Sequence, residues 1–180
     1  AVPRVKALES WGADAICVVA SAGGMLPDEV SAYVRMLRSS VESRIGFHGH
    51  NNLQLAIANC LAASAAGATM LDTTLRGMGR SAGNAQTEIL ALVLKKRGIE
   101  TGIDVWKAMD LSERVVGPLV RGHGVDDVAI TSGYALFHSS FLSKVYRAAE
   151  RLCVDPRDLI VRISEIEKVN VTDELAERVA

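Results

Sequence analysis

The sequence predicts an α/β fold with a parallel sheet, because short apolar runs alternate with helical stretches through its first hundred residues. The runs at 15–19, 45–48 and 69–74 have the length and composition of buried strands. Strands that alternate with helices pair in parallel and carry the helices on the faces of their sheet. With 180 residues, 49% of them hydrophobic, the chain has material for one core and a small appendage.

The first helix is predicted to end at Gly12, and the strand 15–19 follows it. After a loop at 21–24, the next helix begins at Pro27, whose fixed φ suits a first helical position. The acidic pair that follows suits the positive end of the helix dipole. One apolar face of this helix is predicted to contact the sheet, through Val30, Val34, Leu37 and Val41.

The same unit then repeats along the chain. We expect strands at 45–48 and 69–74, helices at 53–66 and 84–97, and a short last strand at 99–103. After Asp104 the strand pattern stops, and helical periodicity continues at 105–116, 135–152 and 156–169. Two domains are therefore predicted, an α/β part over 1–104 and a helical part over 105–180.

Charge and cysteine content exclude several classes of function. The net charge is −1 without a long basic run, which argues against nucleic acid or an anionic membrane surface as partner. Charges interrupt every apolar stretch before it reaches the length of a membrane span. Cys17, Cys60 and Cys153 are odd in number and show no zinc spacing, so buried, reduced thiols in a cytoplasmic protein are expected.

His48 and His50 are the strongest candidates for a functional site. They end the second predicted strand, and residues two apart in a strand point to the same face. Both imidazoles would therefore stand side by side and could hold one metal ion, at the carboxyl end of a strand where α/β barrels carry out catalysis. Taken alone, an HxH pair is also compatible with two polar residues that finish an exposed strand.

A glycine-rich loop at 77–83 follows the third predicted strand. Its glycines allow backbone N–H groups to face a ligand, but the spacing matches neither a Walker motif nor a dinucleotide fingerprint, and a tight turn is the alternative. Arg76 and Arg80 are either anion-binding groups or solvated loop charges. Asn84 either offers its amide oxygen to a metal or caps the following helix.

Two segments carry a resemblance to a known family. Residues 46–53 (GFHGHNNL) and 77–88 (GMGRSAGNAQTE) resemble signatures of the pyruvate-forming metal-dependent aldolases and lyases. This group includes 3-hydroxy-3-methylglutaryl-CoA lyase and 2-isopropylmalate synthase, and the chain resembles 4-hydroxy-2-oxovalerate aldolase most. Residues 133–135 (GYA) and 139–141 (SSF) are similar to a stretch in the helical carboxyl-terminal domain of that family.

The resemblance implies roles for several residues of this chain. His48 and His50 match positions that hold a divalent ion, usually manganese, with magnesium and cobalt as substitutes. Asn84 matches a position that ligates the metal directly or through water, and Ser21 matches a residue whose backbone contacts the pyruvyl carboxylate. The bound ion would stabilise the pyruvate enolate that carbon–carbon cleavage leaves, and a base would remove the proton of the 4-hydroxyl.

The chain departs from the family pattern at two positions. Ala20 stands where the family has an acidic residue, and His138 stands where it has a catalytic tyrosine. Histidine also donates and accepts protons, so His138 is our candidate catalytic residue, with a helix-face histidine without a role as the alternative.

The family builds a (β/α)8 TIM barrel, and only half of its strands are found in this sequence. A barrel of about 250 residues cannot close from these elements. The fold expected is therefore the carboxyl-terminal half of a barrel followed by a small helical domain, inactive by itself, with an aspartate ligand, an arginine and a histidine base supplied by the other half. A separate chain that completes the barrel is the alternative to a truncated enzyme.

The expected function is a metal-dependent lyase that cleaves a 4-hydroxy-2-oxo acid to pyruvate and an aldehyde, as in the catabolism of aromatic hydrocarbons. The alternatives are an isopropylmalate synthase-type condensing enzyme and an inactive half-barrel that serves as a binding module. In the resembling family the helical domain docks onto an acylating aldehyde dehydrogenase. Apolar residues of 137–166 exceed what a small subdomain obviously buries, so we expect such a partner or a homo-oligomer.

Overall fold

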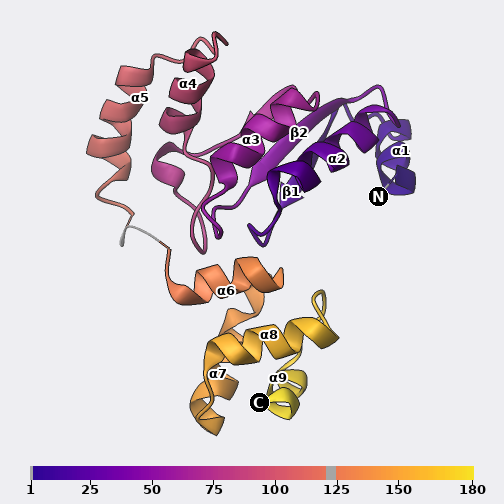
Figure 1. The fold of residues 1–180 in the computed structure, drawn as a ribbon, viewed down its shortest axis with the longest axis vertical. Coiled ribbons are helices and arrows are strands. Elements are labelled where there is room, and N and C mark those ends of the chain that lie inside the picture. Colours follow the sequence, from indigo (N-terminus) through magenta and orange to yellow (C-terminus); the bar gives the residue numbers. More distant parts are fainter. Residues whose placement is uncertain (1, 121–124) are drawn as a thin grey trace.

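The computed structural model describes residues 2–120 and 125–180. An α/β part is followed by a helical part, as the succession of colours along the ribbon shows (Figure 1). The strands are β1 (Ala15–Ala20), β2 (Arg44–Gly49) and β3 (Met70–Asp72). Up to residue 120 the helices are α1 (Val2–Ser10), α2 (Pro27–Arg38), α3 (Ala56–Ala65), the short turn η1 (Leu75–Gly77), α4 (Thr87–Lys96), α5 (Val105–Leu111) and the π-type turn η2 (Ser112–Val116). The remaining helices are α6 (Asp127–Ala135), the 3₁₀ turn η3 (Ser139–Phe141), α7 (Leu142–Leu152), α8 (Pro156–Ile166) and α9 (Asp173–Val179).

The three strands form one parallel sheet in the order β1-β2-β3, which confirms the predicted α/β class. The register pairs Val19 with His48 and His48 with Asp72, so these three residues lie on one face of the sheet. Helices α2 and α3 cover the other face. The core between them includes the predicted apolar face, and all of its members are buried: Val30, Val34 and Leu37 of α2, and Val41, which follows the helix.

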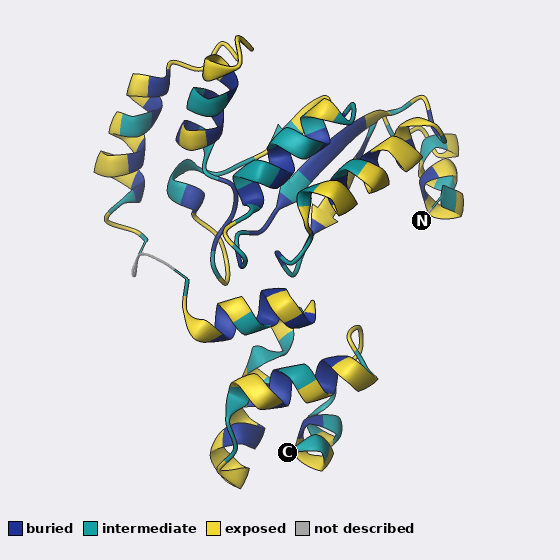
Figure 2. Ribbon diagram, viewed as in Figure 1, coloured by how far each residue is buried: buried dark blue, intermediate teal, exposed yellow. Residues whose placement is uncertain are grey.

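The face of the sheet that carries Val19 is open in the described part of the chain. Val19 is 53% exposed and Met70 is 43% exposed, whereas Ile16 and Val18 on the opposite face are buried. Figure 2 colours the ribbon by burial and shows buried, intermediate and exposed stretches side by side in the α/β part. The prediction of a fully buried strand at 15–19 was therefore wrong, since burial alternates along β1. A sheet covered by helices on one side only exposes every second residue of its strands.

The cysteines were only partly predicted. Cys60 lies in α3 and is buried, and burial raises the pKa of its thiol to about 12. Cys17 and Cys153 are exposed, so the expectation of buried thiols was wrong for both of them. Cys17 lies on the open face of β1, and Cys153 follows the end of α7 in a left-handed conformation with a φ of 54°.

The predicted elements also need correction in three respects: one strand, the starts of two helices, and one helical span. Residues 99–103 form no strand, because no neighbouring strand pairs with them in the described part of the chain. Helix α3 begins at Ala56 rather than at residue 53, and α4 begins at Thr87 rather than at residue 84. The third correction concerns 135–152, where α6 ends at Ala135 and a turn precedes α7.

The helical part has its own apolar cluster, made by residues of α6–α9 and the segments between them. Phe137, Val145, Ile160 and Ile163 are among its fully buried members. Helix α5 instead contacts α4 of the α/β part. The domain boundary between residues 104 and 105 stays a prediction. Within residues 2–120 and 125–180 we find no helix of the length and apolarity that a membrane crossing requires.

Candidate metal centre and active site

His48 and His50 lie side by side at the carboxyl end of β2, as their spacing predicts. Their ring centroids are 5.1 Å apart and their planes meet at 72°. His48 is the penultimate residue of the strand, and His50, which follows the strand, is buried. The predicted proximity of the imidazoles is therefore present, while their role as metal ligands stays a prediction.

Asp72 is a site residue that the sequence alone did not reveal. Nδ1 of His48 lies 2.9 Å from Oδ2 of Asp72, which is the register partner of His48 at the end of β3. A carboxylate at this nitrogen holds the imidazole as the tautomer whose other nitrogen, Nε2, accepts a proton or a metal. The sequence did contain an indication of this role, because Asp72 is an acidic residue at the end of the strand that pairs with the strand of His48.

Asn84 lies beside His50 but does not begin a helix. The backbones of His50 and Asn84 form an isolated antiparallel bridge, and the N–H of Ala85 donates to the Gly49 carbonyl. The amide Nδ2 of Asn84 donates to the Met78 carbonyl at 3.2 Å. The alternative that Asn84 caps a helix was therefore wrong, because α4 begins only at Thr87 and its N-cap is Gln86.

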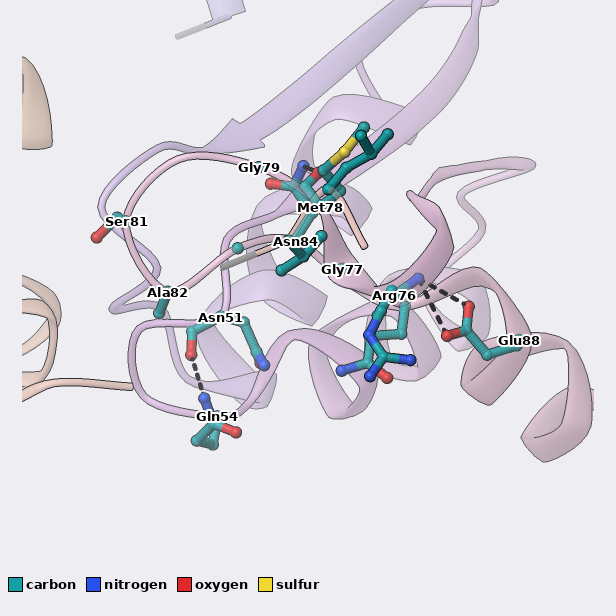
Figure 3. A pocket seen from close by; sticks show the side chains of 14 residues that line it. Asn51, Gln54, Arg76, Gly77, Met78, Gly79, Ser81, Ala82, Asn84 and Glu88 are labelled. Carbon is teal, nitrogen blue, oxygen red and sulfur yellow. Dashed lines mark hydrogen bonds between the residues drawn. The ribbon is translucent and has the colours of Figure 1, made fainter. Parts of the chain in front are cut away.

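The glycine-rich loop closes tightly around Asn84. Gly77 and Gly83 have φ values of 65° and 82°, which glycine adopts without strain. A Cβ on Gly83 would lie 2.3 Å from the Gly77 carbonyl oxygen, and a Cβ on Gly79 would lie 2.6 Å from Nδ2 of Asn84. The loop thus needs glycines to bring its backbone close to the amide of Asn84. This loop borders a cavity of about 510 Å³. Figure 3 shows its lining side chains, with Arg76 and Glu88 on the side away from Ser81.

Two buried polar atoms at the site lack a hydrogen-bond partner among the described residues: Nδ1 of His50 and Oδ1 of Asn84. A buried polar atom without a partner is costly, so a ligand that contacts both atoms fits here. Burial, followed by the positive charge of Arg80, lowers the pKa of His50, which favours the neutral imidazole that a metal binds. No group of three His, Cys, Asp or Glu side chains with metal-binding geometry occurs in residues 2–120 and 125–180.

His138 reaches the glycine-rich loop from the helical part. It precedes η3 rather than lying on a helix face, which corrects the predicted alternative. Its Nδ1 lies 2.7 Å from the Ser140 hydroxyl, and its Nε2 lies 2.9 Å from Nη2 of Arg80. Burial and then the charge of Arg80 lower the pKa of His138. The structure thus places the His138 imidazole beside the loop that borders the candidate metal centre.

Ser21 lies directly after β1, at the same edge of the sheet as His50. The register pairs Ala20 with Gly49, which brings Ser21 beside the end of β2. The Gly23 N–H donates to the Ala20 carbonyl and turns the chain here. Ala20, which stands where the family pattern has an acidic residue, is buried. The contact of Ser21 with a carboxylate stays a prediction.

Helix α6 packs against these loops. Asn52 is buried, and its Nδ2 donates to the Ser81 hydroxyl at 2.8 Å and to the Ala129 carbonyl at 3.0 Å. A Cβ on Gly24 would lie 2.0 Å from the Gly133 carbonyl oxygen. The helical part is therefore held closely to the strand ends, and His138 is positioned by that contact.

A model of the HMGL-like family matches residues 1–115 of this sequence. The chain belongs to the HMGL-like family. A model described as a DmpG-like communication domain matches residues 123–176, which corresponds to the helical part.

Named relatives agree with this assignment. The chain is 46% identical over 180 residues to the 4-hydroxy-2-oxovalerate aldolase of Carboxydothermus hydrogenoformans, covering 99% of this chain and 54% of the relative. It is also 46% identical to the enzyme of the same name from Moorella thermoacetica, covering 99% of this chain and 53% of the relative. The chain thus spans about half the length of the curated relatives it matches.

Solved structures show the same fold. An HMG-CoA lyase from Acinetobacter baumannii, in complex with coenzyme A and 3-methylmalate, is 28% identical with a TM-score of 0.62, over 71% of this chain and 44% of that chain. The carboxyl transferase domain of Rhizobium etli pyruvate carboxylase has a TM-score of 0.75 at 18% identity, over 99% of this chain and 32% of that chain. At 18% identity, the similarity to the carboxyl transferase domain shows a shared fold and nothing further.

Proposed function

We propose that this chain is the carboxyl-terminal part of a metal-dependent aldolase that cleaves a 4-hydroxy-2-oxo acid, such as 4-hydroxy-2-oxovalerate, to pyruvate and an aldehyde. The observation that carries the proposal is the adjacent pair His48 and His50 beside the orphaned amide oxygen of Asn84. Identity of 46% to named 4-hydroxy-2-oxovalerate aldolases supports the choice of substrate.

His48, His50 and Asn84 would hold a divalent cation, manganese in the first place, with magnesium or cobalt as substitutes. Such an ion supplies Lewis acidity to the two oxygens of the 2-oxo acid. Ser21, at the neighbouring strand end, would bind the pyruvyl carboxylate through its backbone N–H. Asp72 would keep His48 in its ligating tautomer.

His138 would exchange a proton with the 4-hydroxyl of the substrate. Its depressed pKa keeps the ring neutral near pH 7, so one nitrogen is able to accept a proton while the other donates. The contacts of α6 with the strand-end loops fix the approach of His138 from the helical part. Full-length His138→Ala is expected to lose turnover while its affinity for substrate changes little.

We propose that the remaining strands of a (β/α)8 barrel, absent from this chain, lie against β1 and β3 and cover the open face of the sheet. The exposed apolar side chains of Val19 and Met70 support this, because a closed barrel buries such residues in its interior. A carboxylate from those strands would complete the metal site. This chain alone is then inactive, with 1–104 as half-barrel and 105–180 as helical domain.

The helical part is proposed to dock onto an acylating aldehyde dehydrogenase that takes over the aldehyde, or onto a second copy of the enzyme. The match of residues 123–176 to a communication-domain model supports a docking role. Ile130 and Tyr134 of α6 are 46% and 74% exposed, which leaves apolar surface for a partner. The proposed setting is the cytoplasm, in the breakdown of aromatic hydrocarbons.

Pyruvate release from 4-hydroxy-2-oxovalerate tests the function in the full-length protein. We expect release with manganese, loss of release after chelation with EDTA, and recovery when manganese is returned. A condensing enzyme of the isopropylmalate synthase type would instead consume acetyl-CoA, and an inactive binding module would do neither. Sedimentation with and without an acylating dehydrogenase tests the partner, and a monomer that ignores the dehydrogenase would contradict it.

A further inference from the structure

Arg80 projects from the glycine-rich loop onto the segment that carries His138. Nη2 of Arg80 lies 2.9 Å from Nε2 of His138, and Nη1 donates to the Ser139 hydroxyl at 3.2 Å. The two residues are 58 positions apart in the chain. The guanidinium therefore lies where the glycine-rich loop of the α/β part meets the segment before η3.

Arg80 has no acidic counterpart in the described part of the chain. The salt bridges of residues 2–120 and 125–180 pair other arginines with carboxylates, but none involves Arg80. Its guanidinium contacts the His138 imidazole and donates to the Ser139 hydroxyl. An exposed guanidinium beside one histidine and one serine hydroxyl has the chemistry of a carboxylate receptor.

We propose that Arg80, together with Ser139, binds a second carboxylate on the substrate, carried by the carbon that becomes the aldehyde. This inference rests on the proposed function and names its substrate class as 4-hydroxy-2-oxo dicarboxylic acids. The sequence left open whether Arg80 binds an anion or is a solvated loop charge. The proposal assigns it to anion binding.

The position of His138 determines which end of the substrate Arg80 meets. The first carboxylate belongs with the 2-oxo group at the metal ligands and at Ser21, on the strand ends. His138 serves the hydroxyl on C4, and Arg80 contacts His138 directly. A group bonded to C4 is therefore the part of the substrate nearest to the guanidinium. The guanidinium of Arg80 can donate two parallel hydrogen bonds to a carboxylate bonded to C4. A methyl group at the same position, as in 4-hydroxy-2-oxovalerate, accepts no hydrogen bond.

The chemistry needs no further reactant. The hydroxyl on C4 gives up its proton and becomes the carbonyl of the aldehyde, the C3–C4 bond breaks, and a proton adds to C3 to form the methyl group of pyruvate. With 4-hydroxy-2-oxoglutarate the second product is glyoxylate, and with 4-hydroxy-2-oxovalerate it is acetaldehyde. Arg80 contributes binding and orientation and does not exchange a proton.

The test compares these two substrates in the full-length, manganese-loaded enzyme. We expect a higher kcat/KM for 4-hydroxy-2-oxoglutarate, and Arg80→Gln should lower that preference about 10- to 100-fold, mainly through KM, as expected for a lost charge-assisted hydrogen bond. Arg80→Lys should restore part of the preference. Arg97→Gln, at the exposed end of α4, is the matched control and should leave it unchanged.

The outcomes separate this inference from the proposed function. If Arg80→Gln lowers kcat/KM equally for both substrates, Arg80 only stabilises the contact between the glycine-rich loop and the segment of His138. The inference is then wrong. A wild-type enzyme that prefers 4-hydroxy-2-oxovalerate, with Arg80→Gln unchanged in preference, also overturns it while the aldolase function stands. Absence of pyruvate from both substrates overturns the proposed function as well.

Discussion

Nδ1 of His48 and Oδ2 of Asp72 lie 2.9 Å apart, across the pair of strands β2 and β3. The carboxylate of Asp72 is 62% exposed, whereas the side chain of His48 is 18% exposed. Their parallel register places both residues on the open face of the sheet, so the geometry follows from the backbone. The pair gives the imidazole a fixed orientation before any ligand arrives.

Asp72→Asn is expected to weaken manganese binding about 10- to 100-fold, because the ligating tautomer of His48 loses its carboxylate partner. Isothermal titration of the full-length protein with MnCl₂ measures the change. Asp110→Asn, an exposed change on α5, serves as control and should leave the affinity unaltered. Equal affinities in wild type and Asp72→Asn would show that Asp72 does not orient the ligand.

Gly79→Ala is expected to weaken manganese binding about tenfold, on the scale seen for groups that orient metal ligands, while the free energy of unfolding changes by less than about 1 kcal/mol. The new Cβ would lie 2.6 Å from Nδ2 of Asn84, and the amide at the end of that side chain must rotate away. Gly46→Ala is the control, since its Cβ meets nothing nearer than 3.4 Å. Unchanged binding in Gly79→Ala would argue that Asn84 is not part of the metal centre.

The metal-free protein is expected to lose stability as the pH falls below 6.5, in part through His138. Burial and Arg80 depress the pKa of the folded-state imidazole below its usual 6.5, so the unfolded chain binds this proton more tightly. Unfolding then takes up a proton, and the free energy of unfolding declines. Urea midpoints at pH 7.5 and pH 5.5 should fall more in wild type than in His138→Gln. An equal decrease of the urea midpoint in both proteins would contradict a lowered pKa of His138 in the folded state.

The adjacency of His48 and His50 could be predicted because it depends only on local geometry. Residues two apart in a strand share a face in any sheet, and the apolar run before them marks the strand. The parallel pairing followed in the same way from the alternation of strands and helices. These features can be predicted without knowing which distant segments of the chain are in contact.

The remainder of the site depends on contacts between distant segments. The sequence from Asn84 onward has the composition of a helix, but its bridge to His50 keeps the chain extended until Thr87. The contact of Arg80 with His138 joins loops from different parts of the fold, and no periodic pattern encodes it. Residues 99–103 have the β-branched content of a strand, yet a strand forms only where a neighbour pairs with it.

The location of manganese in crystals of the full-length protein tests the central claim most directly, because the proposed chemistry depends on one ion held by His48 and His50. An anomalous difference map should show a single peak about 2.0–2.3 Å from a nitrogen of each imidazole, on the scale of metal–histidine bonds. A peak that touches only one of the two histidines, or that lies away from both, would contradict the account.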